Sequence, residues 1–160
     1  MDKEKIDRYS FKVTQANKTQ LVVLVYDIIL DDIKTAKEEF TAGKIEQFVS
    51  TVKHGRRFVQ ELMRTVDCQY EIGLDLMTLY LYINKRMIKA IIQRKPDALE
   101  GLPEVIGKLQ NAFDRISRTD YTGPVMQSTE QVYAGLTYNK RDLSEAYLDA
   151  GNQIKRGFTV

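Results

Sequence analysis

Apolar residues recur at helical spacing in four long segments of this chain. The segments span residues 18–42, 45–66, 72–94 and 102–118. In the first of them, four polar residues follow one another at steps of four, three and four, which only a helix places on one face. These residues are Asp27, Asp31, Lys34 and Glu38. With short connections between the segments, the pattern predicts an all-α fold, an antiparallel up-and-down four-helix bundle.

The predicted helix ends carry matching signals. Asn17, followed three residues later by Gln20, resembles a capping box at the start of the first segment, and Gly43 is a typical residue for its end. Pro96 closes the third segment because its ring does not allow the helix to continue. Pro103 stands at a tolerated position in the first turn of the fourth.

Two segments have more apolar surface than one core face requires. Residues 21–26 are six apolar residues in a row, which a helix points to all sides. In the third segment, the predicted core face consists of Ile72, Leu76, Leu79, Ile83, Met87 and Ile91. A second apolar face consists of Leu74, Met77, Leu81, Ile88 and Ile92. Either these helices are central in the bundle, or they form an apolar groove for a partner segment.

The two ends of the chain lie outside the four-segment pattern. In residues 1–14, Ile6, Tyr9 and Val13 fall at helical spacing, and we expect Ile6 and Tyr9 to rest on the first long helix. The alternative is a frayed terminus. We expect residues 1–119 to form the bundle domain and residues 120–160 a C-terminal extension, made of a linker and a short helix over about 140–156.

The C-terminal extension is too apolar to stay solvated. Its apolar residues include Val132, Tyr133, Leu136, Tyr138, Leu143, Tyr147 and Ile154. We expect the extension to pack on or near the bundle, beside Leu81 and Ile88. It would be either a permanent fifth helix or an internal stand-in for a bound partner.

Composition narrows the class of protein. A chain of 160 residues with 43% hydrophobic content is long enough for one well-packed domain. The net charge is +2, and basic pairs are interspersed with acidic residues, so we do not expect a nucleic-acid partner. The single cysteine, Cys68, excludes an intramolecular disulfide, and we recognise no membrane span or signal peptide. A reducing cytoplasm is the expected location.

No catalytic or cofactor motif is present in the sequence. The only histidine, His54, has no glutamate three positions before it, which excludes the paired Glu-x-x-His elements of di-metal bundles. Cys68 has no evident base beside it, and no phosphate-binding loop or dinucleotide fingerprint occurs. We therefore expect a binding protein and no enzyme, with neither a cofactor nor a metal.

The stretch "VTQANKTQLVVLVYDIIL" resembles the start of the first long helix in the flagellin export chaperones, the FliS family. That signature has a hydrophobe, a Thr-Ala-Ser/Thr-Pro-like cap and then Leu-Ile-x-Met-Leu-Tyr-Asp. "LMRTVD" and "LYLYINKRMIKA" resemble two later motifs of the family, and the resemblance covers about residues 9–118. The chain differs at the helix entry, which is Asn17-Lys18, at Leu81, where the family has aspartate, and in lacking a tryptophan near the end of the fourth helix.

The resemblance implies a cytoplasmic chaperone of the flagellar type III secretion system. Such a chaperone binds the disordered C-terminal segment of flagellin, prevents premature polymerisation and delivers it to the export gate. The flagellar anti-sigma factor is a further candidate partner. The predicted flagellin-binding residues are Ile6, Tyr9, Leu21, Leu24, Val25, Tyr26, Tyr80, Leu81, Tyr82 and Ile88. The alternative is a structural bundle whose apolar faces form a permanent homodimer; for a chaperone we expect a monomer or a weak homodimer.

Overall fold

The computed structural model describes residues 3–126, with the side chains of residues 7–126. The elements are α1 (Lys3–Gln15), α2 (Lys18–Thr41), α3 (Ile45–Thr65), α4 (Glu71–Gln93), the 3-10 helix η1 (Pro96–Leu99) and α5 (Leu102–Ser117). Within this part of the chain there is no strand, so the all-α prediction is confirmed. The predicted helix over 140–156 and most of the predicted extension lie outside the described residues, and the proposed division at residue 119 stays a prediction.

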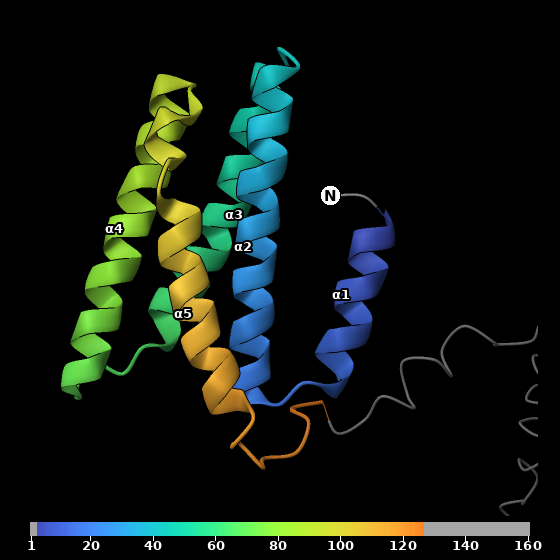
Figure 1. The fold of residues 1–160 in the computed structure, drawn as a ribbon, viewed down its shortest axis with the longest axis vertical. Helices are drawn as coiled ribbons and strands as arrows, with labels where there is room; N and C mark the ends of the chain where they lie inside the picture. Colours follow the sequence, from blue (N-terminus) through green and yellow to red (C-terminus); the bar gives the residue numbers. More distant parts are fainter. Residues whose placement is uncertain (1–2, 127–160) are drawn as a thin grey trace, which may run out of the picture. The chain divides into compact units, whose positions relative to one another are not determined.

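Helices α2 to α5 form the predicted antiparallel bundle. Figure 1 shows them running alternately up and down, with α1 on the outer side of α2. Helix α2 packs against both α3 and α5, and α4 packs against α3. In the described part of the chain, no helix has the length and apolarity needed to cross a membrane.

The start of α2 is fixed by the predicted capping box. The backbone N–H of Gln20 donates to Asn17 Oδ1 at 2.8 Å, and the backbone N–H of Asn17 donates to Gln20 Oε1 at 3.0 Å. Two backbone donors that the first turn would otherwise leave unpaired are thereby satisfied. The helix ends at Thr41, and Gly43 follows with φ +74°, a conformation in which only glycine avoids a steric penalty.

The connection from α4 to α5 is tighter than the sequence indicated. Arg94 ends α4 in the left-handed conformation (φ 52°), and Pro96 opens η1. Leu99 of η1 is completely buried in the core. Gly101, with φ 75°, then precedes α5, whose first turn contains Pro103 as predicted. The short 3-10 helix therefore closes one end of the core between α4 and α2.

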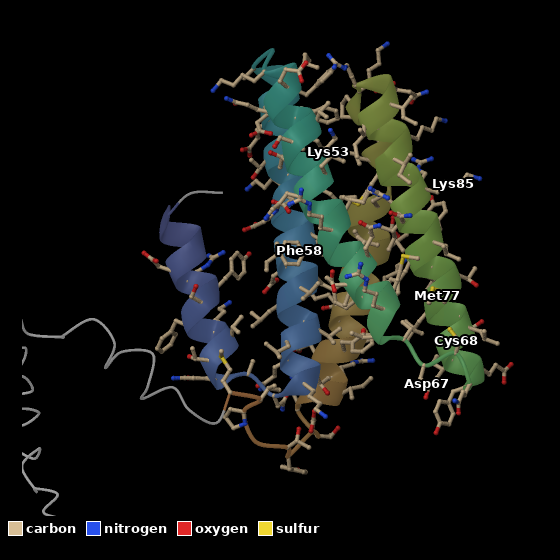
Figure 2. All side chains as sticks on the ribbon, turned by 180° about the vertical axis from the view of Figure 1, so that it is seen from behind. Lys53, Phe58, Asp67, Cys68, Met77 and Lys85 are labelled. Atoms are coloured by element: carbon tan, nitrogen blue, oxygen red, sulfur yellow. The ribbon has the colours of Figure 1, made fainter. Side chains whose placement is uncertain are left out.

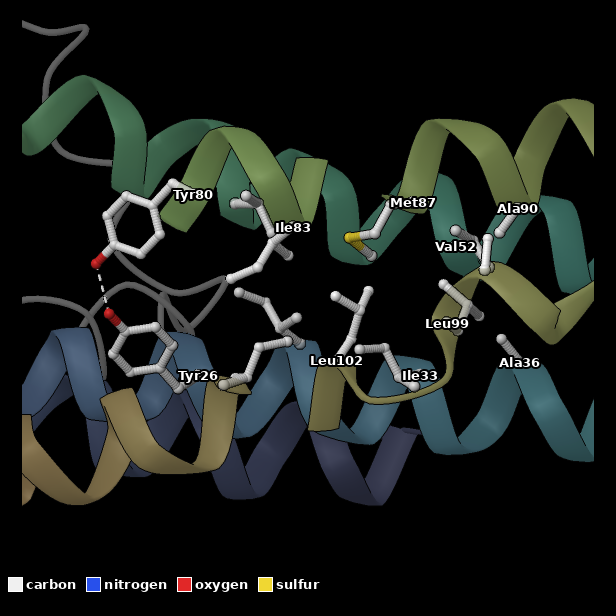
Figure 3. Close-up of a cluster of buried hydrophobic side chains, with 14 of the residues drawn as sticks. Tyr26, Ile33, Ala36, Val52, Tyr80, Ile83, Met87, Ala90, Leu99 and Leu102 are labelled. Carbon is white, nitrogen blue, oxygen red and sulfur yellow. Dashed lines mark hydrogen bonds between the residues drawn. The ribbon is translucent and has the colours of Figure 1, made fainter. Parts of the chain in front are cut away.

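The core is a single cluster of side chains from α2 to α5 and η1. Figure 3 shows Ile33 facing Met87, Leu99 and Leu102 across the bundle, and the hydroxyls of Tyr26 and Tyr80 sharing a hydrogen bond. All of these side chains are at most 2% exposed. Burial of this kind is the main stabilising contribution to a helical bundle.

The predicted core face of α4 is partly wrong. Ile72 is 68% exposed and Leu79 is 37% exposed. The buried residues of α4 follow one another at steps of seven, three, four and three, and they are Gly73, Tyr80, Ile83, Met87 and Ala90. Two of the five are small residues, and a search for large apolar side chains therefore selects the adjacent row.

Helix α1 docks on α2 through a second, smaller apolar cluster. Tyr9 and Ala16 are buried against Leu24 and Ile28, with Val13, Leu21 and Phe58 packed around them. The Tyr9 hydroxyl donates to Asp31 Oδ2 at 2.9 Å. The structure thus confirms that Tyr9 rests on the first long helix of the bundle and is not part of a frayed end.

Candidate functional site

An apolar pocket of about 630 Å³ opens at the end of the bundle where α2 begins and α5 ends, the lower end in Figure 1. All four bundle helices contribute to it. Its apolar lining consists of Leu21, Val22, Val25, Leu62, Val66, Ile72, Leu76, Tyr80, Phe113 and Val125. The charged side chains at its rim are Lys18, Glu61 and Asp67. Such a lining suits an apolar segment of another chain better than a polar small molecule.

The inner wall of the pocket is a buried aromatic group. Tyr80 lines the pocket and shares a hydrogen bond with Tyr26, whose ring lies 5.7 Å from that of Phe113. Burial raises the pKa of both phenols above the ordinary value, and the hydrogen bond with Tyr80 adds to the rise at Tyr26. Both hydroxyls therefore stay neutral and paired, so the wall offers no charge to a bound segment.

The mouth of the pocket is shaped by the turn between α3 and α4. Ile72, at the start of α4, lines the pocket while 68% exposed. At Gly73 a Cβ atom would lie 1.9 Å from the carbonyl oxygen of Asp67. Only glycine allows the turn to fold this closely onto the start of α4. Gly73 therefore holds Ile72 at the rim with its side chain accessible.

The segment after α5 forms another part of the rim. The Asp120 carbonyl accepts a hydrogen bond from Asn17 Nδ2 at 3.0 Å, and Thr19 Oγ1 donates to an Asp120 carboxylate oxygen at 2.6 Å. Further along, the Val125 amide donates to the carbonyl of Ala16 at 3.1 Å. These bonds tie residues 120–125 to the turn between α1 and α2 and bring Val125 to the pocket.

Helix α1 covers the neighbouring face of α2. Arg8 lies 3.6 Å from Asp31, the carboxylate that accepts the Tyr9 hydrogen bond. Burial, followed by this hydrogen bond, raises the pKa of Tyr9 to about 12. The contact between α1 and the bundle thus combines one polar anchor with the small apolar cluster around Leu24.

The outer face of α4 is uncovered by the rest of the described chain. Leu81 is 50% exposed and Tyr82 is 45% exposed. Ile88 lies further along, in a separate groove of about 380 Å³ between α3 and α4. Figure 2 shows this side of the molecule, with α3 and α4 next to each other.

A family model described as flagellar protein FliS matches residues 4–120 of the chain. The chain belongs to the FliS family. It is thus a member of a chaperone family that acts in flagellum biogenesis, which is not a family of enzymes. No curated protein matches the chain.

The predicted flagellin-binding residues lie on several different surfaces of this FliS-family bundle. Leu21, Val25 and Tyr80 meet in the apolar pocket. Tyr9 and Leu24 are buried between α1 and α2, and Tyr26 is in the core. Leu81, Tyr82 and Ile88 belong to the α4 surface. Ile6 lies in α1, and its side chain is outside the described residues. The role of these residues in binding stays a prediction.

Sequence reasoning missed several lining residues of this FliS-family pocket. Phe113 falls at helical spacing in the fourth predicted segment, and Leu62 and Val66 do so in the second, which by itself indicates core residues. The available signal was the position of these residues at the end of their helices, where bundle helices diverge. Val125 had no signal, because a backbone hydrogen bond brings it there.

The two residues considered for catalysis, His54 and Cys68, lie in different surroundings. His54 Nδ1 lies 2.7 Å from Asp32 Oδ2, a carboxylate buried between α2 and α3. Burial raises the pKa of Asp32, and the hydrogen bond with His54 opposes that rise. Cys68 is exposed in the α3–α4 turn. Among the described residues, no three His, Cys, Asp or Glu side chains are grouped as metal ligands.

Proposed function

We propose that this FliS-family protein binds the disordered C-terminal segment of flagellin in the cytoplasm and delivers it to the flagellar export gate. The observation that carries the proposal is the apolar pocket at the end of the bundle. A disordered segment with amphipathic stretches would associate through its own apolar faces, and such faces match the pocket lining. Ordering the segment on the bundle costs about 2–5 kcal/mol, which the buried apolar area must offset.

Three features support a site for an extended or helical segment. The pocket is open, its lining is continuous across four helices, and its rim residues Ile72 and Val125 are accessible. Leu81 and Tyr82, exposed on α4, extend the apolar surface beyond the pocket. We propose that flagellin follows this surface and that Leu21, Val25 and Tyr80 form the part of the site inside the pocket.

The test is binding of a flagellin C-terminal fragment to an Ile72→Glu variant. Ile72 lines the pocket but is mostly exposed, so a glutamate there should weaken binding at least tenfold while the thermal midpoint stays within a few degrees. Ile116→Glu is the matched control, since Ile116 is 53% exposed on α5 and does not line the pocket. Equal binding by both variants would refute the pocket as the flagellin site.

The alternative, a structural homodimer, rests on the exposed apolar residues of α4. Leu74 is 53% exposed and Ile92 is 76% exposed, and a second copy could cover them. Sizing the protein alone and with the flagellin fragment separates the two functions. An obligate dimer keeps its mass and ignores the fragment, whereas a chaperone forms a larger complex with it. Partners beyond flagellin, the export gate and the anti-sigma factor, can be tested in the same way.

A further inference from the structure

The groove between α3 and α4 has basic side chains on one wall and apolar side chains on the other. It is lined by Lys53, Arg56, Arg57 and Gln60 from α3 and by Ile88 and Ile91 from α4. It shares no lining residue with the apolar pocket. Figure 2 shows Lys53 on α3, with α4 beside that helix.

The positive charge of this groove is not balanced by acids on the adjoining turns of α3 and α4. Helix α3 has no Asp or Glu between Glu46 and Glu61, and α4 has none after Asp75. Elsewhere on the bundle, Arg64 and Arg118 each contact a carboxylate, at 2.7 and 2.6 Å. Among the described residues, no carboxylate forms an ion pair with the basic residues that line the groove, which are Lys53, Arg56 and Arg57.

One of these cations is held in place by a neutral partner. Arg56 Nε donates to Asn84 Oδ1 at 2.8 Å, which fixes the guanidinium across the two helices. Because the amide carries no charge, the full positive charge of Arg56 remains available at the groove. A guanidinium fixed in this way loses less side-chain freedom when it contacts a carboxylate.

The opposite wall continues as an apolar stripe along α4. Leu81, Ile88 and Ile92 are separated by seven and four residues, so they share one face of the helix. Leu81 is 50% exposed and Ile92 is 76% exposed. Without a partner, this stripe leaves apolar area in contact with water beside an uncompensated row of cations.

We infer that the α3–α4 groove is a second docking site, which takes an acidic amphipathic helix of a partner protein. The apolar stripe of that helix packs on Ile88 and Ile92, and its Asp or Glu residues face the α3 cations. A groove between two helices fits a third helix better than it fits a flat lipid surface. The site lets the protein hold an acidic partner and a segment in the apolar pocket at the same time.

The chain's own C-terminal residues do not supply this charge. Residues 127–160 contain four acidic and four basic residues, so their net charge is zero. Charge complementarity therefore favours a different protein as the partner. The inference stands apart from the proposed function, because it concerns residues outside the apolar pocket.

The experiment measures binding of a fluorescent 18-residue designed helix with a leucine stripe flanked by glutamates. The full-length parent is compared with the Lys53→Glu/Arg57→Glu variant and with Lys34→Glu/Lys44→Glu, a control of equal charge change at exposed sites outside the groove. We expect binding to weaken about tenfold in the first variant and less than twofold in the control, since exposed ion pairs contribute a few-fold each. The same helix with lysines in place of glutamates should not bind.

Several results would overturn the inference. Equal binding of the glutamate helix by both variants would mean that the groove is not its site. Tighter binding of phosphatidylglycerol vesicles or of a DNA duplex would assign the cations to another class of partner. A parallel loss of flagellin-fragment binding in the Lys53→Glu/Arg57→Glu variant would make the groove part of the flagellin surface. Undiminished fragment binding, together with loss of the glutamate helix, supports two separate sites.

Discussion

The hydrogen bond between Tyr26 and Tyr80 allows a quantitative test of the core next to the pocket. The two side chains are 1% and 2% exposed, and each hydroxyl is the other's partner. Replacing either tyrosine with phenylalanine leaves one buried hydroxyl without its partner, which should cost about 1–3 kcal/mol of unfolding free energy. The double variant removes both polar groups and keeps both rings, so it should cost much less than the sum of the two single changes. We expect a coupling of about 1–2 kcal/mol.

The assay is urea unfolding of the parent, the two single variants and the double variant, followed by far-UV circular dichroism. Tyr121→Phe serves as the control, because Tyr121 is 94% exposed and its loss should not move the transition. The denaturant slope should stay the same in all proteins, so that midpoints report stability alone. Two single effects that add to the double effect within about 0.5 kcal/mol would refute the pairing.

Three further predictions concern the rim of the pocket and α1. Gly73→Ala should lower the free energy of unfolding by about 1–3 kcal/mol, because the added Cβ overlaps a backbone carbonyl of the α3–α4 turn. Gly107→Ala is the control, since the space around Gly107 is open, and thermal melts of the two variants measure the difference. Hydrogen bonds from Thr122 and from Thr19 of α2 lower the pKa of Asp120 to about 2. The ionised Asp120 therefore stabilises the fold fully above its ordinary pKa near 4, and this contribution is lost as the pH falls towards 2. NMR titration of Thr122→Val should show a higher pKa for Asp120. Tyr9→Phe removes the hydrogen bond between α1 and Asp31. Hydrogen exchange should then become faster at the backbone amides of α1 and stay unchanged at those of α2.

The helix boundaries were predictable because their signals are local. The Asn17 capping box, the glycine at position 43 and the proline at position 103 each act within one turn of a helix. The core face of α4 was not fully predictable. Its buried row includes Gly73, which the close approach of Asp67 requires, and Ala90, and a periodicity of large apolar residues records neither of them.

The pocket could be predicted only in part. Its α2 side, Leu21 and Val25, followed from the surplus of apolar residues in one helix. Its other sides depend on which helix ends meet in space, and the position of Val125 depends on a backbone hydrogen bond to Ala16. The short η1 helix could not be predicted for a similar reason, because the burial of Leu99 is decided by tertiary packing.

The apolar run at residues 21–26 is divided among several environments, and this division can be tested. Val25 lines the pocket, Leu24 is buried beneath α1, and Tyr26 is in the core. Leu24→Ala should remove part of the support of α1 and cost about 2 kcal/mol, with faster amide exchange in α1 and fragment binding at the pocket kept within threefold. Val25→Ala should instead weaken binding of the flagellin fragment and leave exchange in α1 unchanged. If both variants lost both properties to the same degree, the run would act as one packed unit, and the separation of the pocket from the α1 contact would be wrong.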